Sequence, residues 1–378
     1  MGRYQPLYPG TYFTGSYGRD DRDSSFDQDG NKVESAVPTI AGSTSFPESR
    51  YEGTFAWYFP LFETYGYAFI SARIFTSRVG FGYADEDTEG SLAQFIAANP
   101  DGRPQTQTGA QGISDVTLEF GSFLYGSENW RTRTETPFSM LLLLGLKAPV
   151  GTYDHQAPVT PGSNHISWHL KLGAHWRPWN GGFLDAGAGW RRHDTDDEPQ
   201  FGRLAPARQG YDVTFDASFA QKLFRGLYLT AFATQRDTGE NTYKDIFYAP
   251  NAPEPPPATP PATSSETFPT PGTYRDGGTF LRTAGASLQY FVTQRWLAAL
   301  HWTHPLAGES GQFLLPFTNR QCTAGGSGGA VTCTDTEGET RLQDGQGAAR
   351  SFASDRVVLS FTYNFTSEDL FPCPGCQD

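Results

Sequence analysis

The sequence predicts an all-β chain that forms a transmembrane antiparallel up-and-down β-barrel of about 12 strands with long extracellular loops. Three observations predict this fold. First, segments of about ten residues alternate apolar and polar side chains, which is the period of a strand with two different faces. Second, very short and long connections alternate between these segments. Third, the 378 residues include 15% aromatic side chains and 42 glycines, but no apolar run near the roughly 18 residues of a membrane-spanning helix.

About twelve segments show this alternation, which is the even strand number expected of such a barrel. They are residues 8–18, 51–61, 67–82, 116–124, 138–148, 165–177, 184–191, 211–219, 227–236, 280–290, 296–303 and 356–365. Segment 165–177 is the clearest, because Trp168 and Trp176 lie near the two ends of its apolar face. Eight strand residues tilted by about 40° span roughly 20 Å, which fits an apolar band of about 25 Å between two aromatic girdles. The alternative is a soluble sandwich with two core tryptophans, which would not sort its loops so regularly.

The connections predict the orientation of the chain. Outer-membrane barrels have short periplasmic turns and longer extracellular loops, so the long connections are expected on the cell surface. These expected extracellular loops are residues 19–50, 84–111, 195–210, 241–278 and 308–354. Both chain ends then lie on the periplasmic side, with the barrel over residues 1–366 and a periplasmic tail over residues 367–378.

The net charge bears on the partners of the protein, and its cysteine content bears on its compartment. The formal net charge of −13 argues against nucleic acid, which requires a basic face. The four cysteines form two close pairs, Cys322 with Cys333 and Cys373 with Cys376, and we expect two disulfides formed in an oxidising compartment. No apolar signal-peptide core follows Met1, so we expect the mature form of a Gram-negative outer-membrane protein, its signal peptide absent, among outer-membrane lipid and lipopolysaccharide.

The strand face opposite the apolar one should line the barrel lumen. Charges there must be hydrated or paired, so each is either part of a solute path or a structural ion pair. Leu141 and Leu143 break the alternation, and they suit either a passage for apolar molecules or packing under an in-folded loop. The expected lumen-facing residues of a solute path are Arg73, Glu119, Leu141, Leu143, His169, Lys171, His175, Arg177, Asp185, Arg191, Asp212 and Asp216.

We expect no catalytic residues, no cofactor and no metal. Ser167 lies near His169 and His175, but a membrane-embedded hydrolase would place its nucleophile and histidine on the outer rim. The step of six residues between the two histidines argues against a shared metal ion. The Asp-rich segment 20–30 departs from a calcium loop at two ligand positions, so a solvated turn is the simpler interpretation.

Several short motifs resemble a known family. They are an aromatic first strand followed by Phe26-Asp27-Gln28-Asp29-Gly30, then Gly112-Ile113-Ser114-Asp115, then Leu146-Lys147-Ala148-Pro149-Val150-Gly151-Thr152-Tyr153-Asp154, and the aromatic last strand. Together, over residues 8–365, they resemble the outer-membrane transporters named for the meta-cleavage pathway of phenol degradation. The resemblance implies a mid-sized outer-membrane barrel associated with uptake of aromatic or other apolar compounds.

Two functions follow from these observations. The first is an outer-membrane channel or transporter for passive uptake of small apolar or aromatic solutes, with loops 84–111 and 308–354 as lids. The second is a structural or interaction barrel with a closed lumen, whose long loops bind a cell-surface partner, while a periplasmic partner is a further option. The Pro-rich stretch 253–261, which cannot join a sheet ladder, favours the second.

Overall fold

The fold is seen in a computed structural model, which describes most of the chain. The described residues are 10–22, 24–27, 29–34, 44–61, 64–81, 107–125, 137–153, 161–196, 207–208, 210–244, 263–269, 273–293, 295–309, 311, 313–324, 331–341 and 351–365. Within these ranges no helix is long and apolar enough to cross a membrane.

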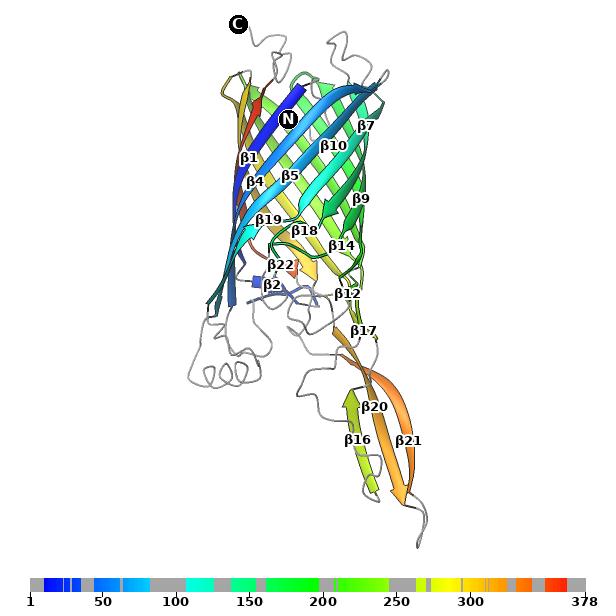
Figure 1. The fold of residues 1–378 in the computed structure, drawn as a ribbon. Coiled ribbons are helices and arrows are strands. Elements are labelled where there is room, and N and C mark those ends of the chain that lie inside the picture. Colours follow the sequence, from blue (N-terminus) through cyan, green and yellow to red (C-terminus); the bar gives the residue numbers. More distant parts are fainter. Residues whose placement is uncertain are drawn as a thin grey trace.

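Thirteen of the described strands form one large antiparallel barrel sheet (Figure 1). Its strands are β1 (Gly10–Arg22), β4 (Thr44–Leu61), β5 (Thr64–Phe81), β6 (Gln107–Ile113), β7 (Val116–Tyr125), β8 (Phe138–Ala148), β9 (Ser167–Trp179), β10 (Gly182–His193), β13 (Asp212–Phe224), β14 (Leu227–Thr238), β18 (Thr279–Phe291), β19 (Trp296–Glu309) and β23 (Arg356–Asn364). Strands consecutive in the barrel pair with each other, β5 pairs with both β4 and β7, and β23 pairs back onto β1. The predicted all-β, antiparallel up-and-down barrel is confirmed.

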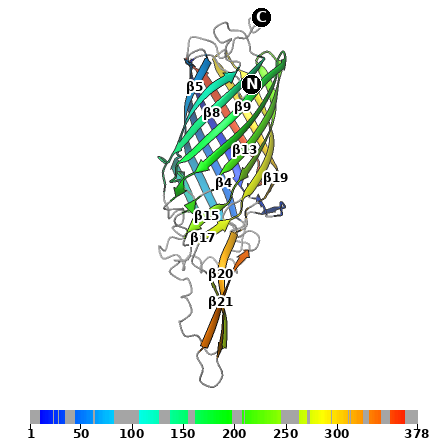
Figure 2. The same ribbon diagram turned by 90° about the vertical axis from the view of Figure 1, so that its right-hand side faces the viewer.

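The two ends of the barrel differ. At one end, here called the turn end, β9 meets β10 and β13 meets β14 through tight turns, where Gly181 and Gly226 have positive φ values of 79° and 68°. The start of β1 and the end of β23 also meet there, because the N–H of Phe365 donates to the carbonyl of Thr11 at 2.9 Å. The opposite end, called the loop end, carries the described strands that lie outside the barrel sheet (Figures 1 and 2).

The segments expected as long loops contain strands of their own. The additional strands are β2 (Ser24–Phe26), β3 (Lys32–Glu34), β11 (Thr195–Asp196), β12 (Ala207–Arg208), β15 (Asn241–Lys244), β16 (Thr263–Pro269), β17 (Thr273–Asp276), β20 (Phe313–Ala324), β21 (Val331–Arg341) and β22 (Ser351–Phe352). β1 and β4 also pair as far as Arg22 and Phe46, well inside the expected loop 19–50. A backbone ladder does not require alternating apolar and polar side chains, so side-chain alternation did not mark these strands. That these segments are extracellular stays a prediction.

One hairpin stands apart from the barrel. β20 and β21, with β16 beside β20, project beyond the loop end (Figure 2). Cys322 and Cys333 are paired across this hairpin and form the predicted disulfide. Cys373 and Cys376 lie outside the described residues, so the second disulfide stays a prediction.

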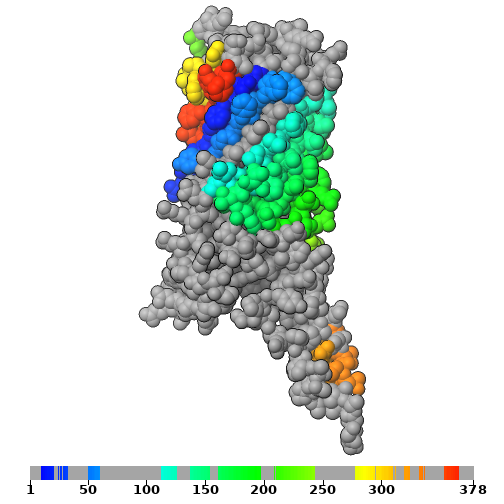
Figure 3. All heavy atoms as spheres, viewed as in Figure 1, coloured from blue at the N-terminus to red at the C-terminus, as the bar shows by residue number. Residues whose placement is uncertain are grey.

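The outer surface of the barrel is apolar and the inner surface is polar. Along β9, Trp168 and Trp176 are 47% and 50% exposed, whereas His169 and His175 between them are 8% and 1% exposed. In a barrel, alternation of this sense places the apolar side chains toward lipid and the polar ones toward the lumen. Figure 3 shows this outer surface over β1 and β4 and over β7, β8 and β9.

Candidate functional site in the barrel lumen

Acid–base pairs line the inner wall between β7 and β13. Nε2 of His169 lies 2.5 Å from Oε1 of Glu119, and Nζ of Lys171 lies 2.8 Å from Oδ1 of Asp216. The partners belong to strands that are not neighbours, since the first pair crosses β8 and the second crosses β10. Each of these four side chains therefore has a partner of opposite chemistry, which offsets part of the cost of removing it from water.

Glycines on the crossed strands make room for these pairs. Gly145 of β8 pairs with Glu119 on one side and with His169 on the other, and a Cβ atom on Gly145 would overlap the His169 imidazole. Gly187 and Gly189 hold the corresponding positions of β10 beneath the second pair. Nδ1 of His169 is buried and has no hydrogen-bond partner among the described residues.

The deepest pair lies toward the turn end. Nδ1 of His175 lies 2.7 Å from Oδ1 of Asp185, and the two side chains are 1% and 2% exposed. The hydroxyl of Ser218 donates to Oδ2 of the same carboxylate at 3.1 Å. The His175 ring stacks on Phe183 with ring centroids 5.5 Å apart. Both carboxylate oxygens are thus bound, and the histidine is fixed between an acid and an aromatic ring.

An apolar patch, Phe123, Leu141 and Leu143, adjoins these pairs. Phe123 pairs with Leu141 across β7 and β8, and Leu143 pairs with Lys171 across β8 and β9. The three side chains are 2%, 4% and 5% exposed, whereas Leu144 on the outer face is 54% exposed. The two leucines therefore lie inside the barrel, as expected, and are covered there.

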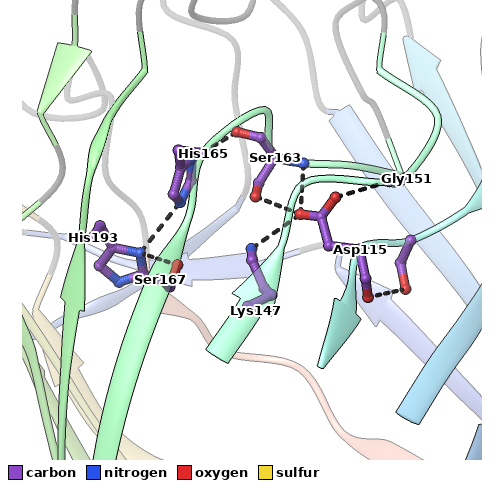
Figure 4. Close-up of polar contacts among 8 residues, drawn as sticks. Asp115, Lys147, Gly151, Ser163, His165, Ser167 and His193 are labelled. Carbon is purple, nitrogen blue, oxygen red and sulfur yellow. Dashed lines mark hydrogen bonds and ion pairs between the residues drawn. The ribbon is translucent and has the colours of Figure 1, made fainter. Parts of the chain in front are cut away.

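A second polar network lies at the loop end, around Asp115 (Figure 4). Asp115 sits between β6 and β7, and its carboxylate accepts hydrogen bonds from the N–H of Gly151 at 3.1 Å and from the N–H and hydroxyl of Ser163 at 3.0 and 2.5 Å. Nζ of Lys147 lies 3.3 Å from the same carboxylate. One buried acid thus holds both described parts of the connection between β8 and β9 against the barrel rim.

Two histidines continue this network into β10. Nδ1 of His165 lies 2.6 Å from the Ser163 carbonyl, which can only accept, so this nitrogen carries a proton. Nε2 of His165 lies 3.2 Å from Nδ1 of His193, and Nε2 of His193 lies 3.3 Å from Oδ2 of Asp212. A neutral His165 accepts at Nε2, so the two rings link Ser163 to Asp212 through one chain of contacts.

This arrangement only superficially resembles a hydrolase triad. The hydroxyl of Ser167 lies 2.9 Å from Nδ1 of His193, and Asp212 lies on the other side of the ring. A general base needs a free lone pair toward the serine, and Nδ1 of His193 is also in contact with Nε2 of His165 at 3.2 Å. Ser167 is also 0% exposed, so no substrate reaches its hydroxyl in this arrangement.

The His165 contact predicts a pH-dependent stability. Burial, together with the positive charges of Lys147 and His193, lowers the pKa of His165 from 6.5 to about 4, although Ser163 and Asp115 oppose the shift. Between these values the unfolded chain binds the proton and the folded chain does not, so stability falls as the pH drops from 6.5 towards 4. Urea unfolding across this window should show a falling midpoint.

The matched variant for this prediction is His165→Gln, which keeps a polar side chain but cannot titrate. We expect its unfolding midpoint to vary less than that of the wild type over the same pH range. A variant profile that parallels the wild-type profile would show that another group titrates.

The structure brings some of the expected lumen residues together and leaves others apart. Asp212 accepts hydrogen bonds from Arg236 at 2.8 Å and Thr238 at 3.1 Å. Arg177 lies at the turn end, where it donates to Asn180 at 3.1 Å. Arg191 lies on the inner face of β10 opposite Asp212, and the Arg73 side chain lies outside the described residues. That these residues line a solute path stays a prediction.

Sequence reasoning missed the loop-end network. Its members are Asp115, Lys147, Ser163, His165, His193 and Arg236. The period of two, continued beyond the predicted end of its strand at residue 191, would have placed His193 on the inner face. Within the described residues no group of three or more His, Cys, Asp or Glu side chains is arranged to hold a metal ion.

Comparison with known proteins decides the family. A family described as putative MetA-pathway of phenol degradation matches residues 26–251, which is more than half of the 378 residues. The chain belongs to this family. The resemblance seen in the short motifs is therefore confirmed. No curated protein matches this family member.

One solved structure supports the fold of this family member, and two others are less similar. The COG4313 outer membrane channel from Pseudomonas putida F1 is similar over 97% of this chain and 99% of that chain, with 14% identity and a TM-score of 0.58. The NanC porin has 6% identity and a TM-score of 0.36 over 93% of this chain and 98% of that chain. A deltaS2 mutant of the TodX monoaromatic hydrocarbon channel has 8% identity and a TM-score of 0.30 over 95% and 91%. Only the first TM-score bears on the fold, and it agrees with an outer-membrane barrel.

Proposed function

We propose that the chain is a porin-like channel of the bacterial outer membrane for passive uptake of small apolar or aromatic compounds. The observation that carries this proposal is the apolar patch of Phe123, Leu141 and Leu143 beside charges that are already paired. Paired charges exert little net field on ions, whereas apolar side chains on the same wall favour apolar solutes. The family description, which names phenol degradation, supports the same solute class.

The proposed solute path follows the inner faces of β7 to β10 and β13. The apolar patch is covered in this structure, so a solute would contact it only once the covering side chains move aside. It would then provide contact area for an aromatic ring, and the neighbouring acid–base pairs would provide polar atoms for a hydroxyl group. The residues proposed to line it are Arg73, Glu119, Leu141, Leu143, His169, Lys171, His175, Arg177, Asp185, Arg191, Asp212 and Asp216.

The test replaces the apolar patch without changing charge. In the double variant Leu141→Ser/Leu143→Ser, uptake of phenol into proteoliposomes is expected to fall about tenfold, which corresponds to about 1.4 kcal/mol of lost apolar contact. The matched control is Leu142→Ser/Leu144→Ser, which changes the adjacent, outward-facing leucines. Equal uptake by the two double variants, or no flux through the wild type, would refute the proposal.

A structural or interaction barrel with a closed lumen is the second candidate. Ser139, His175 and Asn364 lie on the inner wall toward the turn end and are 0%, 1% and 0% exposed, which favours a lumen filled by side chains. The projecting β20–β21 hairpin offers a surface for a partner (Figure 2). Planar-bilayer conductance separates the candidates, because a correctly folded wild type without conductance supports this second role.

A further inference from the structure

A pocket of about 330 Å³ opens on the rim of the barrel at the loop end. Trp190 and Arg192 of β10, Arg208 of β12, Tyr211 before β13, and Glu240 before β15 contribute to its lining. We call it the Arg192 pocket. His193 of the loop-end network also lines it, but Trp190 and Arg192 belong to the outward face of β10.

Close backbone packing shapes the pocket. The N–H of Gly239 donates to the carbonyl of Tyr211 at 2.7 Å, and the N–H of Gly210 donates to Oδ1 of Asn241 at 2.9 Å. A Cβ atom on Gly239 would lie 2.9 Å from the Tyr211 ring, and one on Gly210 would overlap the Gly239 carbonyl. These glycines let the segments before β13 and β15 close on each other, which fixes the Tyr211 ring as one wall.

The charge of the pocket suits an anion. Arg192 and Arg208 place two guanidinium groups on its lining, against the single carboxylate of Glu240 among the described lining residues. In the described part of the chain no ion pair joins either arginine to a carboxylate. Guanidinium groups bind phosphate oxygens through parallel N–H donors, which makes a phosphate the anion that fits this pair.

The level of the pocket along the barrel identifies the source of that phosphate. Arg192 pairs with Trp168 across β9 and β10, and Trp168, Trp190 and Tyr211 are 47%, 44% and 55% exposed on the outer face. Tryptophan and tyrosine belts mark the level of lipid headgroups in membrane proteins. Because the belt is at the loop end, the adjoining leaflet is the outer one.

We infer that the Arg192 pocket binds a phosphate group of an outer-leaflet lipid, with Arg192 and Arg208 on the phosphate oxygens and Trp190 and Tyr211 against the adjoining apolar part. A free phosphate shares the anionic chemistry but does not use the aromatic walls. This inference depends on the orientation of the barrel and not on solute transport, so the uptake experiment and the lipid-binding experiment can fail separately.

The test measures retention of phosphorylated lipid A by the full-length protein in detergent, using native mass spectrometry. The double variant Arg192→Gln/Arg208→Gln is expected to retain at least tenfold less lipid A than the wild type. The matched control is Arg282→Gln, because Arg282 is exposed on β18 outside this pocket, where it donates to Gln235 at 3.0 Å. That control should retain lipid A as the wild type does.

Two further arms identify the ligand. Dephosphorylated lipid A should bind the wild type as weakly as phosphorylated lipid A binds the double variant. Millimolar inorganic phosphate should not displace lipid A, and displacement would overturn the lipid assignment in favour of a free phosphate site. Undiminished retention by the double variant would overturn the site itself.

A folding control accompanies the variants. Unboiled samples should migrate faster than boiled ones on gels for every variant, as for the wild type. If the double variant fails this control, lipid A retention is measured on Arg208→Gln alone, because Arg208 lies in β12 outside the barrel sheet. Wild-type retention by that single variant would then count against the pocket.

Discussion

Replacing Asp185 by alanine is expected to lower the free energy of unfolding by about 3–5 kcal/mol, because it leaves a buried partner unpaired. His175 is 1% exposed and loses its acceptor at 2.7 Å, and the Ser218 hydroxyl loses its acceptor at 3.1 Å. Neither the His175 nor the Ser218 side chain can reach water unless the barrel wall opens. Urea unfolding in lipid vesicles, followed by tryptophan fluorescence, would measure the change.

The controls for this prediction separate the pair from a general effect of charge. Asp194→Ala removes an exposed acid just beyond the end of β10, and we expect a change below about 0.5 kcal/mol. The double variant His175→Phe/Asp185→Leu replaces the pair with apolar groups and should be more stable than Asp185→Ala alone. A double variant less stable than the single one would contradict this account.

Replacing Gly145 by alanine is expected to force His169 out of its place on the inner wall. The added Cβ atom would occupy the space of the His169 imidazole, so the contact with Glu119 at 2.5 Å cannot survive. Loss of this buried pair together with overpacking should cost about 3 kcal/mol or more. The same vesicle unfolding assay applies.

A rescue experiment tests the steric cause of this loss. In a His169→Ala background the space next to Gly145 is empty, so Gly145→Ala should cost less than about 1 kcal/mol there. Ala174→Val, on the outward-facing side of β9, is the control for added volume and should be tolerated. If Gly145→Ala costs the same in both backgrounds, its effect does not act through His169.

The fold could be predicted from the sequence because each strand of a membrane barrel has one face toward lipid and the other toward the lumen. Along β9 the period of two placed Trp168 and Trp176 outside and His169 and His175 inside, as the structure has them. The ends of strands were less predictable, because a backbone ladder continues where the alternation of apolar and polar side chains stops. The pairing of Arg22 with Phe46 at the far ends of β1 and β4 is an example.

The site could be predicted only in part, because pairing depends on which strands come within reach across the wall. The sequence placed Glu119 and His169 on the inner face, but not that they meet across β8. That contact requires the glycine at position 145, whose importance appears only once three strands are aligned. The role of Asp115 was hidden for the same reason, since its partner Ser163 lies 48 residues away.

The contact between the first and last strands has a consequence for assembly. The hydroxyls of Thr14 and Thr362 share a hydrogen bond of 2.8 Å across a separation of 348 residues, within an unbroken ladder from Tyr12 to Asp20. That ladder cannot form until the whole chain has been synthesised and exported. The hairpins between β1 and β23, in contrast, join residues that are closer in sequence and can form early. Until then β1 and β23 each present an open edge, which invites pairing with other chains. Pairing of β23 with β1 is thus the final step of barrel closure. The open edges of these two strands are what an assembly factor would have most need to protect.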